Sequence, residues 1–258
     1  MYFANIQSST KYLQKLRLAH IRSWDDLYVK EIASYDEDAQ NEGTIWFDDS
    51  AAEERMLEYL EEKICETQIL GEHICRENCS FLDLGTGNGH FLFQLRTGSE
   101  EASIERRGWN GRMLGVDFSE KSIEFARRIG SEKKGKDIEF KQCDIMMTDP
   151  TEVINTGQNM EGWDVVLDKG TFDAISLSYE RDNHGRRIHE SYCEKICPLV
   201  KKGGIFLITS CNWTEEELLS WFCGPELVHV DTIKYNSFSF GGRTGQTVNT
   251  VCFRKEIR

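Results

Sequence analysis

The chain has 258 residues, of which 39% are hydrophobic and 29% are charged, and its formal net charge is −13. This length fits one large domain, or one domain with a small extension. The acidic balance argues against stable nucleic-acid binding, which needs basic patches, and favours a basic protein or another cationic partner.

The N-terminal segment is predicted to be a helical extension, or lid, of residues 1–45, followed by a main domain of residues 46–258. Apolar residues such as Tyr12, Leu16, Trp24 and Tyr28 recur there at three- and four-residue spacing. This spacing is typical of amphipathic helices, and we expect a break near Ser23.

Segments typical of strands and helices alternate from residue 80 onward, after a first helix over residues 51–65. We expect a surface loop over residues 98–112. The expected strands are residues 81–84, 113–117, 138–143, 163–168, 205–209, 227–235 and 247–253. The expected helices are residues 89–95, 119–129, 186–199 and 215–222. Such alternation predicts an α/β fold with a parallel sheet covered on both faces and a hairpin at one edge.

No apolar run approaches the ~20 residues that span a bilayer, and no signal peptide is visible. The nine cysteines are scattered without a C-x-x-C pair. We therefore expect a soluble cytoplasmic protein with reduced thiols, no membrane contact and no metal site.

A glycine-rich turn follows the first expected strand, where three glycines alternate in the run Gly85-Thr86-Gly87-Asn88-Gly89. Glycines at a turn between a strand and a helix let the backbone approach a ligand closely. Asp83 precedes them and would repel a pyrophosphate, whereas it would hold a ligand that carries an ammonium group. The turn therefore favours S-adenosylmethionine over a dinucleotide, whose Gly-x-Gly-x-x-Gly pattern would need glycine at His90.

The ends of the next two strands carry residues suited to an adenosine. Ligands of open α/β sheets bind at the carboxyl ends of the strands. Asp117 is placed to accept hydrogen bonds from both ribose hydroxyls, with Phe118 beside the adenine. Asp144 is placed to bind the adenine amino group, with Ile145 against the ring. A single acid after a strand is usually a turn or cap residue, but several in this order predict a cofactor site.

The fourth strand leads into Asp168-Lys169-Gly170-Thr171-Phe172, at the position expected to face the reacting methyl group. We expect Asp168 to orient the incoming ammonium, and Phe172, Trp46 and Tyr235 to line a channel through cation–π contacts. The alternative for each aromatic residue is plain core packing. We assign Lys169 a structural role, and Trp24 with Trp46 are candidates for a lid over the cofactor.

The sequence resembles the class I, seven-stranded methyltransferases in its glycine turn, in Gly115-Val116-Asp117-Phe118-Ser119 and in Cys143-Asp144-Ile145. More narrowly, Trp46-Phe47-Asp48-Asp49, the run 167–175 and the run 210–214 resemble the eukaryotic lysine methyltransferases that modify translation elongation factor 1A. The likeness covers residues 20–256, although the charged loop 100–107 is longer than the family pattern requires.

The resemblance implies a Rossmann-like sheet of strand order 3-2-1-4-5-7-6 with an antiparallel last strand. It also implies a protein-lysine N-methyltransferase that uses S-adenosylmethionine and acts on elongation factor 1A. Its expected catalytic residues are Asp168 and Phe172. Its expected cofactor-binding residues are Trp46, Asp83, Gly85, Thr86, Gly87, Asp117, Phe118, Asp144, Ile145 and Asp168. A small-molecule or RNA methyltransferase, or a non-catalytic binding module, are the alternatives on the same fold.

Overall fold

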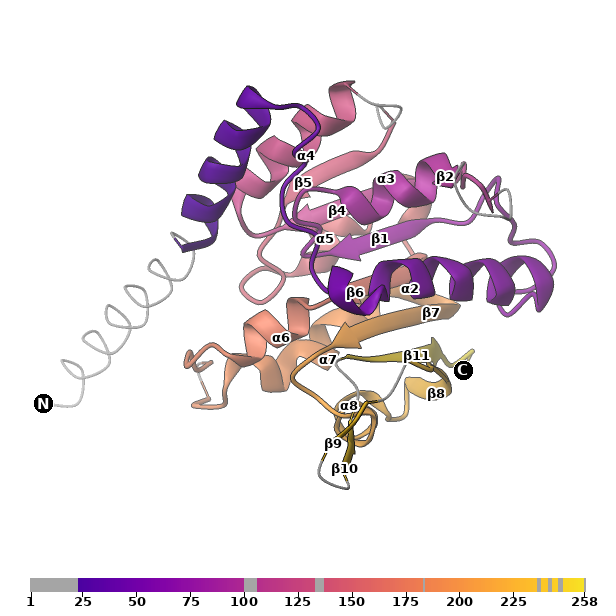
Figure 1. Cartoon of the computed structure of the whole chain (residues 1–258). Helices are drawn as coiled ribbons and strands as arrows, with labels where there is room; N and C mark the ends of the chain where they lie inside the picture. The colour runs from indigo at the N-terminus through magenta and orange to yellow at the C-terminus, as the bar shows by residue number, and fades with distance from the viewer. Residues whose placement is uncertain are drawn as a thin grey trace, which may run out of the picture.

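A seven-stranded sheet forms the centre of the protein (Figure 1). The computed structural model describes residues 23–99, 106–132, 137–182, 184–235, 238–240, 243–245 and 248–257. In spatial order the strands are β5 (Glu139–Gln142), β4 (Met113–Asp117), β1 (Phe81–Leu84), β6 (Trp163–Lys169), β7 (Val200–Ser210), β11 (Asn249–Lys255) and β8 (Leu227–Ile233).

The strand directions confirm the predicted order 3-2-1-4-5-7-6. Strands β5, β4, β1, β6 and β7 are parallel to one another, whereas β11 runs antiparallel to both β7 and β8. A separate two-stranded ribbon, β9 (Phe238–Phe240) and β10 (Arg243–Gly245), lies in the chain between β8 and β11. The antiparallel last strand is therefore inserted between two strands that precede it in sequence.

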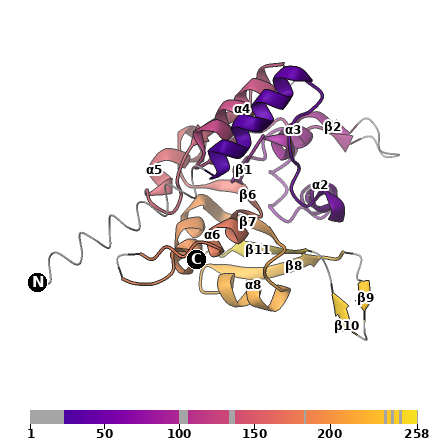
Figure 2. The same cartoon turned by 60° about the vertical axis from the view of Figure 1, so that its left-hand side comes forward.

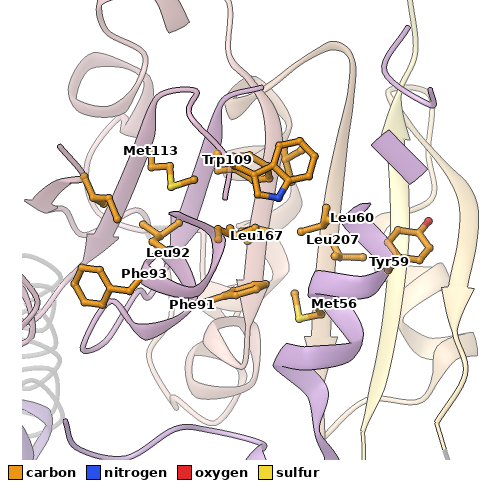
Figure 3. Close-up of a cluster of buried hydrophobic side chains, with 14 of the residues drawn as sticks. Met56, Tyr59, Leu60, Phe91, Leu92, Phe93, Trp109, Met113, Leu167 and Leu207 are labelled. Atoms are coloured by element: carbon orange, nitrogen blue, oxygen red, sulfur yellow. The ribbon is translucent and has the colours of Figure 1, made fainter. Parts of the chain in front are cut away.

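Helices cover both faces of this sheet, as predicted for a parallel arrangement. They are α2 (Ala52–Leu60), α3 (His90–Thr97), α4 (Glu120–Glu132), α5 (Pro150–Ile154), α6 (Thr171–Ser176), α7 (Tyr192–Ile196) and α8 (Glu215–Phe222). Alternate residues of β6 point to opposite faces, so Leu167 joins one core cluster and Val166 joins the other. Figure 3 shows the first cluster, where Met56 and Leu60 of α2 pack near Leu207 of β7.

Three predicted elements differ from the structure. The expected loop 98–112 contains a short pair of strands, β2 (Gly98–Ser99) and β3 (Arg106–Arg107). The expected helix 51–65 ends as an α-helix at Leu60 and continues as a π-helical turn, Glu61–Glu66. The expected helix 186–199 is divided into α7 between two 3₁₀ turns, Ile188–Ser191 and Cys197–Leu199. Pro198 in the last turn has no N–H to donate, which prevents a continuous helix there.

The N-terminal helix of the described chain, residues 23–37, lies along α4 in both views (Figures 1 and 2). The Tyr35 hydroxyl donates to Glu132 Oε2 at 2.7 Å, and Asp36 forms an ion pair with Arg128. These two contacts attach the helix to α4, which packs against β4 and β5. The part of the predicted extension before Ser23 lies outside the described residues.

Within the described parts of the chain, no helix is long and apolar enough to cross a membrane.

Candidate cofactor and active site

A cavity of about 290 Å³ opens at the carboxyl ends of the parallel strands. Nine of the predicted cofactor-binding residues line it: Trp46, Asp83, Gly85, Thr86, Gly87, Asp117, Phe118, Asp144 and Ile145. The structure therefore brings together residues that are up to about a hundred positions apart in sequence, because parallel strands end at one edge of the sheet.

The glycine turn is joined to the neighbouring strand end by a carboxylate. Asp117 Oδ2 accepts from the Gly87 backbone N–H at 3.1 Å, and Thr86 Oγ1 donates to Asp83 Oδ2 at 2.7 Å. Gly87 has a φ of 57°, a left-handed conformation that favours glycine. The turn is thus held in a fixed shape with both acids at the cavity wall.

A second contact joins the glycine turn to α6. A Cβ atom on Gly85 would lie 2.0 Å from Thr171 Oγ1, so no other residue fits without displacing the threonine. The Thr171 hydroxyl also donates to the Leu84 carbonyl at 2.6 Å. The start of α6 and the end of β1 are therefore in direct contact.

Burial raises the pKa of both carboxylates beside this turn, Asp83 and Asp117. Asp83 is 4% exposed, and burial raises its pKa to about 7, while the Thr86 hydrogen bond and the Lys169 charge act in the opposite direction. Burial also raises the pKa of Asp117, against the hydrogen bonds from the Ser119 and Gly87 backbone. A cationic ligand group beside Asp83 would restore its ionised form.

The third strand end presents a fixed acid beside apolar side chains. Asp144 Oδ1 accepts from the backbone N–H groups of Met146 and Met147 at 3.1 and 3.2 Å. Ile145 is buried, whereas Phe118 is half-buried. This combination suits a flat ring whose edge carries an amino group.

Three further polar side chains line the cavity: Glu53, His90 and Lys169, of which only Lys169 was considered from the sequence, with a structural role. Glu53 Oε1 lies 2.5 Å from His90 Nδ1, and Glu53 Oε2 lies 3.6 Å from Lys169 Nζ. Lys169 Nζ also donates to the Trp46 carbonyl at 3.0 Å. The buried Glu53 Oε2 has no hydrogen-bond partner, so it can accept one from a ligand.

The sequence carries little signal for these three residues. Glu53 belongs to α2, which precedes the sheet and is predicted only as a packing helix. His90 directly follows the glycine turn, so its position could have suggested a cavity residue. Lys169 follows Asp168 and was predicted to have a structural role.

Asp168 does not lie where the sequence predicted, either as a catalytic or as a cofactor-binding residue. Its side chain is fully buried and lines no part of the cavity. Its carboxylate accepts from the Tyr192 hydroxyl at 2.6 Å, from the Thr171 N–H at 2.8 Å and from the Phe172 N–H at 3.1 Å. Because β6 extends to Lys169, the pleat turns Asp168 toward α7 and away from the cavity.

The predicted aromatic channel is also wrong for two of its three residues. Phe172 is 1% exposed and packs against Tyr192, Trp213 and Phe222, with ring centroids 5.2, 5.6 and 5.1 Å away. Tyr235 is buried and bonds to Thr250 Oγ1 at 2.7 Å. Neither lines the cavity, so core packing is the correct interpretation of both.

Aromatic side chains from the N-terminal region complete the cavity wall. The Trp24 and Trp46 ring centroids lie 5.5 Å apart, and both residues line the cavity together with Tyr28. Trp46 lies in the connection between helix 23–37 and α2. Phe47 and Ala51 in this connection have positive φ values of 64° and 52°. Such conformations cost non-glycine residues roughly 1–3 kcal/mol and cluster at functional sites.

The fold and the site together define a methyltransferase. A family model described as a methyltransferase domain matches residues 76–251, and the chain belongs to that family.

Two named proteins are similar to this chain over most of its length. The chain is 38% identical to Protein-lysine N-methyltransferase EFM4 of Saccharomyces cerevisiae over 249 residues, which cover 96% of this chain and 98% of that protein. It is 32% identical to EEF1A lysine methyltransferase 2 of Homo sapiens over 233 residues, which cover 90% of this chain and 84% of that protein. These matches confirm the resemblance seen in the sequence.

Solved structures share the fold at low sequence identity. Magnesium protoporphyrin IX methyltransferase from Synechocystis, solved with bound SAM, has a TM-score of 0.52 at 13% identity and covers 83% of this chain and 86% of that one. The [4+2]-cyclase SpnF has a TM-score of 0.51 at 11% identity, with 79% and 81% covered. The fold alone therefore does not define the reaction, and the identity of the substrate must rest on other observations.

Proposed function

We propose that the protein transfers a methyl group from S-adenosylmethionine to a lysine side chain of translation elongation factor 1A. The observation that carries the proposal is the pair of buried acids, Asp83 and Asp117, fixed on either side of a glycine turn at one cavity. The names of the similar proteins, which match nearly the whole chain, support lysine and elongation factor 1A as the acceptor.

The cavity residues fit the chemical groups of this cofactor. Asp117 would hold the ribose hydroxyls, and Asp144 with Ile145 and Phe118 would hold the adenine. At the other end, Asp83 offers an acceptor for an ammonium group, and Glu53 Oε2, which lies 3.6 Å from Lys169 Nζ and has no hydrogen-bond partner, offers a second.

The carboxylate of the cofactor needs a cation, and Lys169 supplies one within the same cavity. S-adenosylmethionine, when bound, supplies a methyl group on a positively charged sulfur. The protein's part is to bind the two reactants in line and to exclude water from them. It must also leave the lysine neutral, since an unperturbed pKa of about 10.4 keeps that amine protonated at neutral pH.

We also propose that residues 1–45 act as a lid on the domain formed by residues 46–258. The contact between Trp24 and Trp46 supports this, because it places the N-terminal helix at the cavity wall. The net charge of −13 suits a basic protein partner. A cytoplasmic location follows from the proposed acceptor, because translation elongation takes place there.

Labelled methyl transfer tests the proposal directly. Purified protein and S-adenosylmethionine with a labelled methyl group are incubated with recombinant elongation factor 1A, with total RNA and with a small-molecule extract. We expect label in the elongation factor, and mass spectrometry should place it on lysine. Label only in RNA or in small molecules, or no label in any fraction, would contradict the proposal.

Cofactor binding should depend on pH through Asp83. Its pKa of about 7 in the free protein should fall when an ammonium binds beside it, so binding releases a proton at and below neutral pH. Affinity for S-adenosylhomocysteine should therefore decrease as pH falls below about 7, by up to roughly tenfold per pH unit.

Calorimetry in buffers of different ionisation enthalpy measures that proton release. Asp83→Asn should bind more weakly at neutral pH and should lose most of the proton release. An affinity that stays constant from mildly acidic to neutral pH in the wild type would rule out this role for Asp83.

A further inference from the structure

The cavity continues past the residues assigned to the cofactor. Its second part is formed by α6, by the chain that follows α6 and by the turn after β7. We name this part the acceptor lobe, and its defining residues are Asp173, Ala174, Ile175, Leu177, Ile188 and Cys211.

The acceptor lobe joins an exposed apolar rim to a buried acid. Leu177 is 65% exposed, Ala174, Ile175 and Ile188 are half-buried, and Asp173 is only 5% exposed. A lysine side chain has the complementary pattern, since its stem is apolar and its head carries a positive charge.

Asp173 is held in place while it keeps free acceptor positions. Its Oδ1 accepts from the Ser210 hydroxyl, and its Oδ2 accepts from the Cys211 N–H at 2.8 Å. The Cys211 thiol also donates a hydrogen bond to this carboxylate. A carboxylate offers about four acceptor positions, so these three bonds leave room for an ammonium. Burial, followed by the charge of Asp173, raises the pKa of the adjacent Cys211 thiol to about 11.

The other candidates near this lobe are already committed. The Asp168 carboxylate faces Tyr192 on the far side of the strand, and the Lys169 ammonium contacts Glu53 and the Trp46 carbonyl. Among the described residues that form the acceptor lobe, Asp173 is the only buried carboxylate, and the nearby Glu180, which also lines the cavity, is only half-buried.

We infer that the acceptor lobe is the slot for the substrate lysine and that Asp173 receives its ammonium group. This inference rests on the proposed function. It names the residue that binds the ammonium group of the substrate lysine and orients it. The proton of the bound ammonium then leaves to water before transfer.

Asp173→Asn tests the inference because it keeps the size and an acceptor oxygen but removes the charge. Its affinity for S-adenosylhomocysteine should stay within about twofold of the wild type. The KM for elongation factor 1A should rise about tenfold or more, the loss expected for one charge-assisted hydrogen bond. The matched control is Glu216→Gln, which removes one exposed acid of α8 outside the cavity and should leave both values unchanged.

A second readout separates lysine capture from a structural role. Binding of elongation factor 1A in the presence of S-adenosylhomocysteine is measured with the intact factor and with a form whose modified lysine is methionine. Asp173→Asn should weaken binding of the intact factor about tenfold and that of the methionine form less than twofold. Equal effects on both forms would overturn the inference.

Ala174→Phe provides a test that leaves the Asp173 carboxylate in place. The larger side chain should fill the acceptor lobe and reduce transfer about 100-fold, with cofactor affinity within about threefold of the wild type. Normal transfer by this variant would also overturn the inference. If the wild type itself does not modify elongation factor 1A, the proposed function fails instead, so the two failures are distinguishable.

Discussion

Asp117→Ala should weaken binding of S-adenosylhomocysteine about 100-fold or more while the protein stays folded. Asp117 is 7% exposed at the cavity wall and is the acid proposed to accept from both ribose hydroxyls. Hydrogen bonds to a charged group contribute about 1.5–3 kcal/mol each, so the loss of two corresponds to at least two factors of ten in affinity.

The same substitution also acts on the glycine turn. Gly87 N–H would lose its carboxylate acceptor, so the turn would keep, among its described hydrogen bonds to β4, only the one from the Thr86 N–H to the Val116 carbonyl at 3.0 Å. Asp117→Asn keeps one acceptor oxygen and should therefore show a smaller loss than alanine.

Isothermal titration measures both variants, and Glu120→Gln is the matched control. Glu120 is an exposed acid three residues further along, outside the cavity, so its replacement should leave the affinity unchanged. Wild-type affinity in Asp117→Ala would show that the ribose is bound elsewhere.

Asp168→Ala should reduce stability rather than remove a catalytic group. The alanine variant leaves the buried Tyr192 hydroxyl and two backbone N–H groups of α6 without their acceptor. An unsatisfied buried group costs about 1–3 kcal/mol, so we expect a loss of roughly 3 kcal/mol or more in the free energy of unfolding. For a chain of this size that corresponds to a decrease in Tm of about 6–12 °C.

The variant Asp168→Asn distinguishes a structural role of Asp168 from a catalytic one. Asparagine can still accept from Tyr192, and the position does not line the cavity, so methyl transfer well below Tm should stay within about threefold of the wild type. A complete loss of transfer in a stable asparagine variant would restore Asp168 to the reacting site.

The pH dependence of unfolding gives an independent check on the burial of Asp168. Burial raises its pKa from 3.8 to about 7, so the folded protein binds more protons than the unfolded chain between these values. The contribution of Asp168 to stability should therefore fall as pH rises through this range, by up to about 1.4 kcal/mol per pH unit. Denaturant unfolding should show the wild type losing stability relative to Asp168→Asn as pH increases.

The gathering of the proposed cofactor-binding residues at one cavity could be predicted from the sequence, because it depends on local patterns and one general rule. Asp83 and the glycines stand in a single run, and Asp117 and Asp144 each follow a recognisable strand. Since the strands are parallel, their ends meet at one edge, and no further knowledge of packing is needed.

The other half depends on facts that the sequence does not carry. Whether Asp168 faces the cavity or the core is decided by the alternation of side chains along β6, and Asp168 stands one residue before Lys169, which lines the cavity. Glu53 reaches the cavity only because α2 packs against the sheet, a contact between segments with no shared pattern. Asp173 lies within the motif that the resemblance identified, but its position on α6 was needed to show that it lines the cavity.

The contact between Gly85 and Thr171 holds the proposed donor and acceptor sites at a fixed spacing. The segment that would hold the methyl donor is in direct contact with the helix that carries Asp173. The Thr171 hydroxyl joins the two through its hydrogen bond to the Leu84 carbonyl. Donor and acceptor are then spaced by the rigid interior of the sheet, not by the surface chain that covers them. Substitutions in residues 23–45 should therefore leave unchanged the separation over which the methyl group must travel.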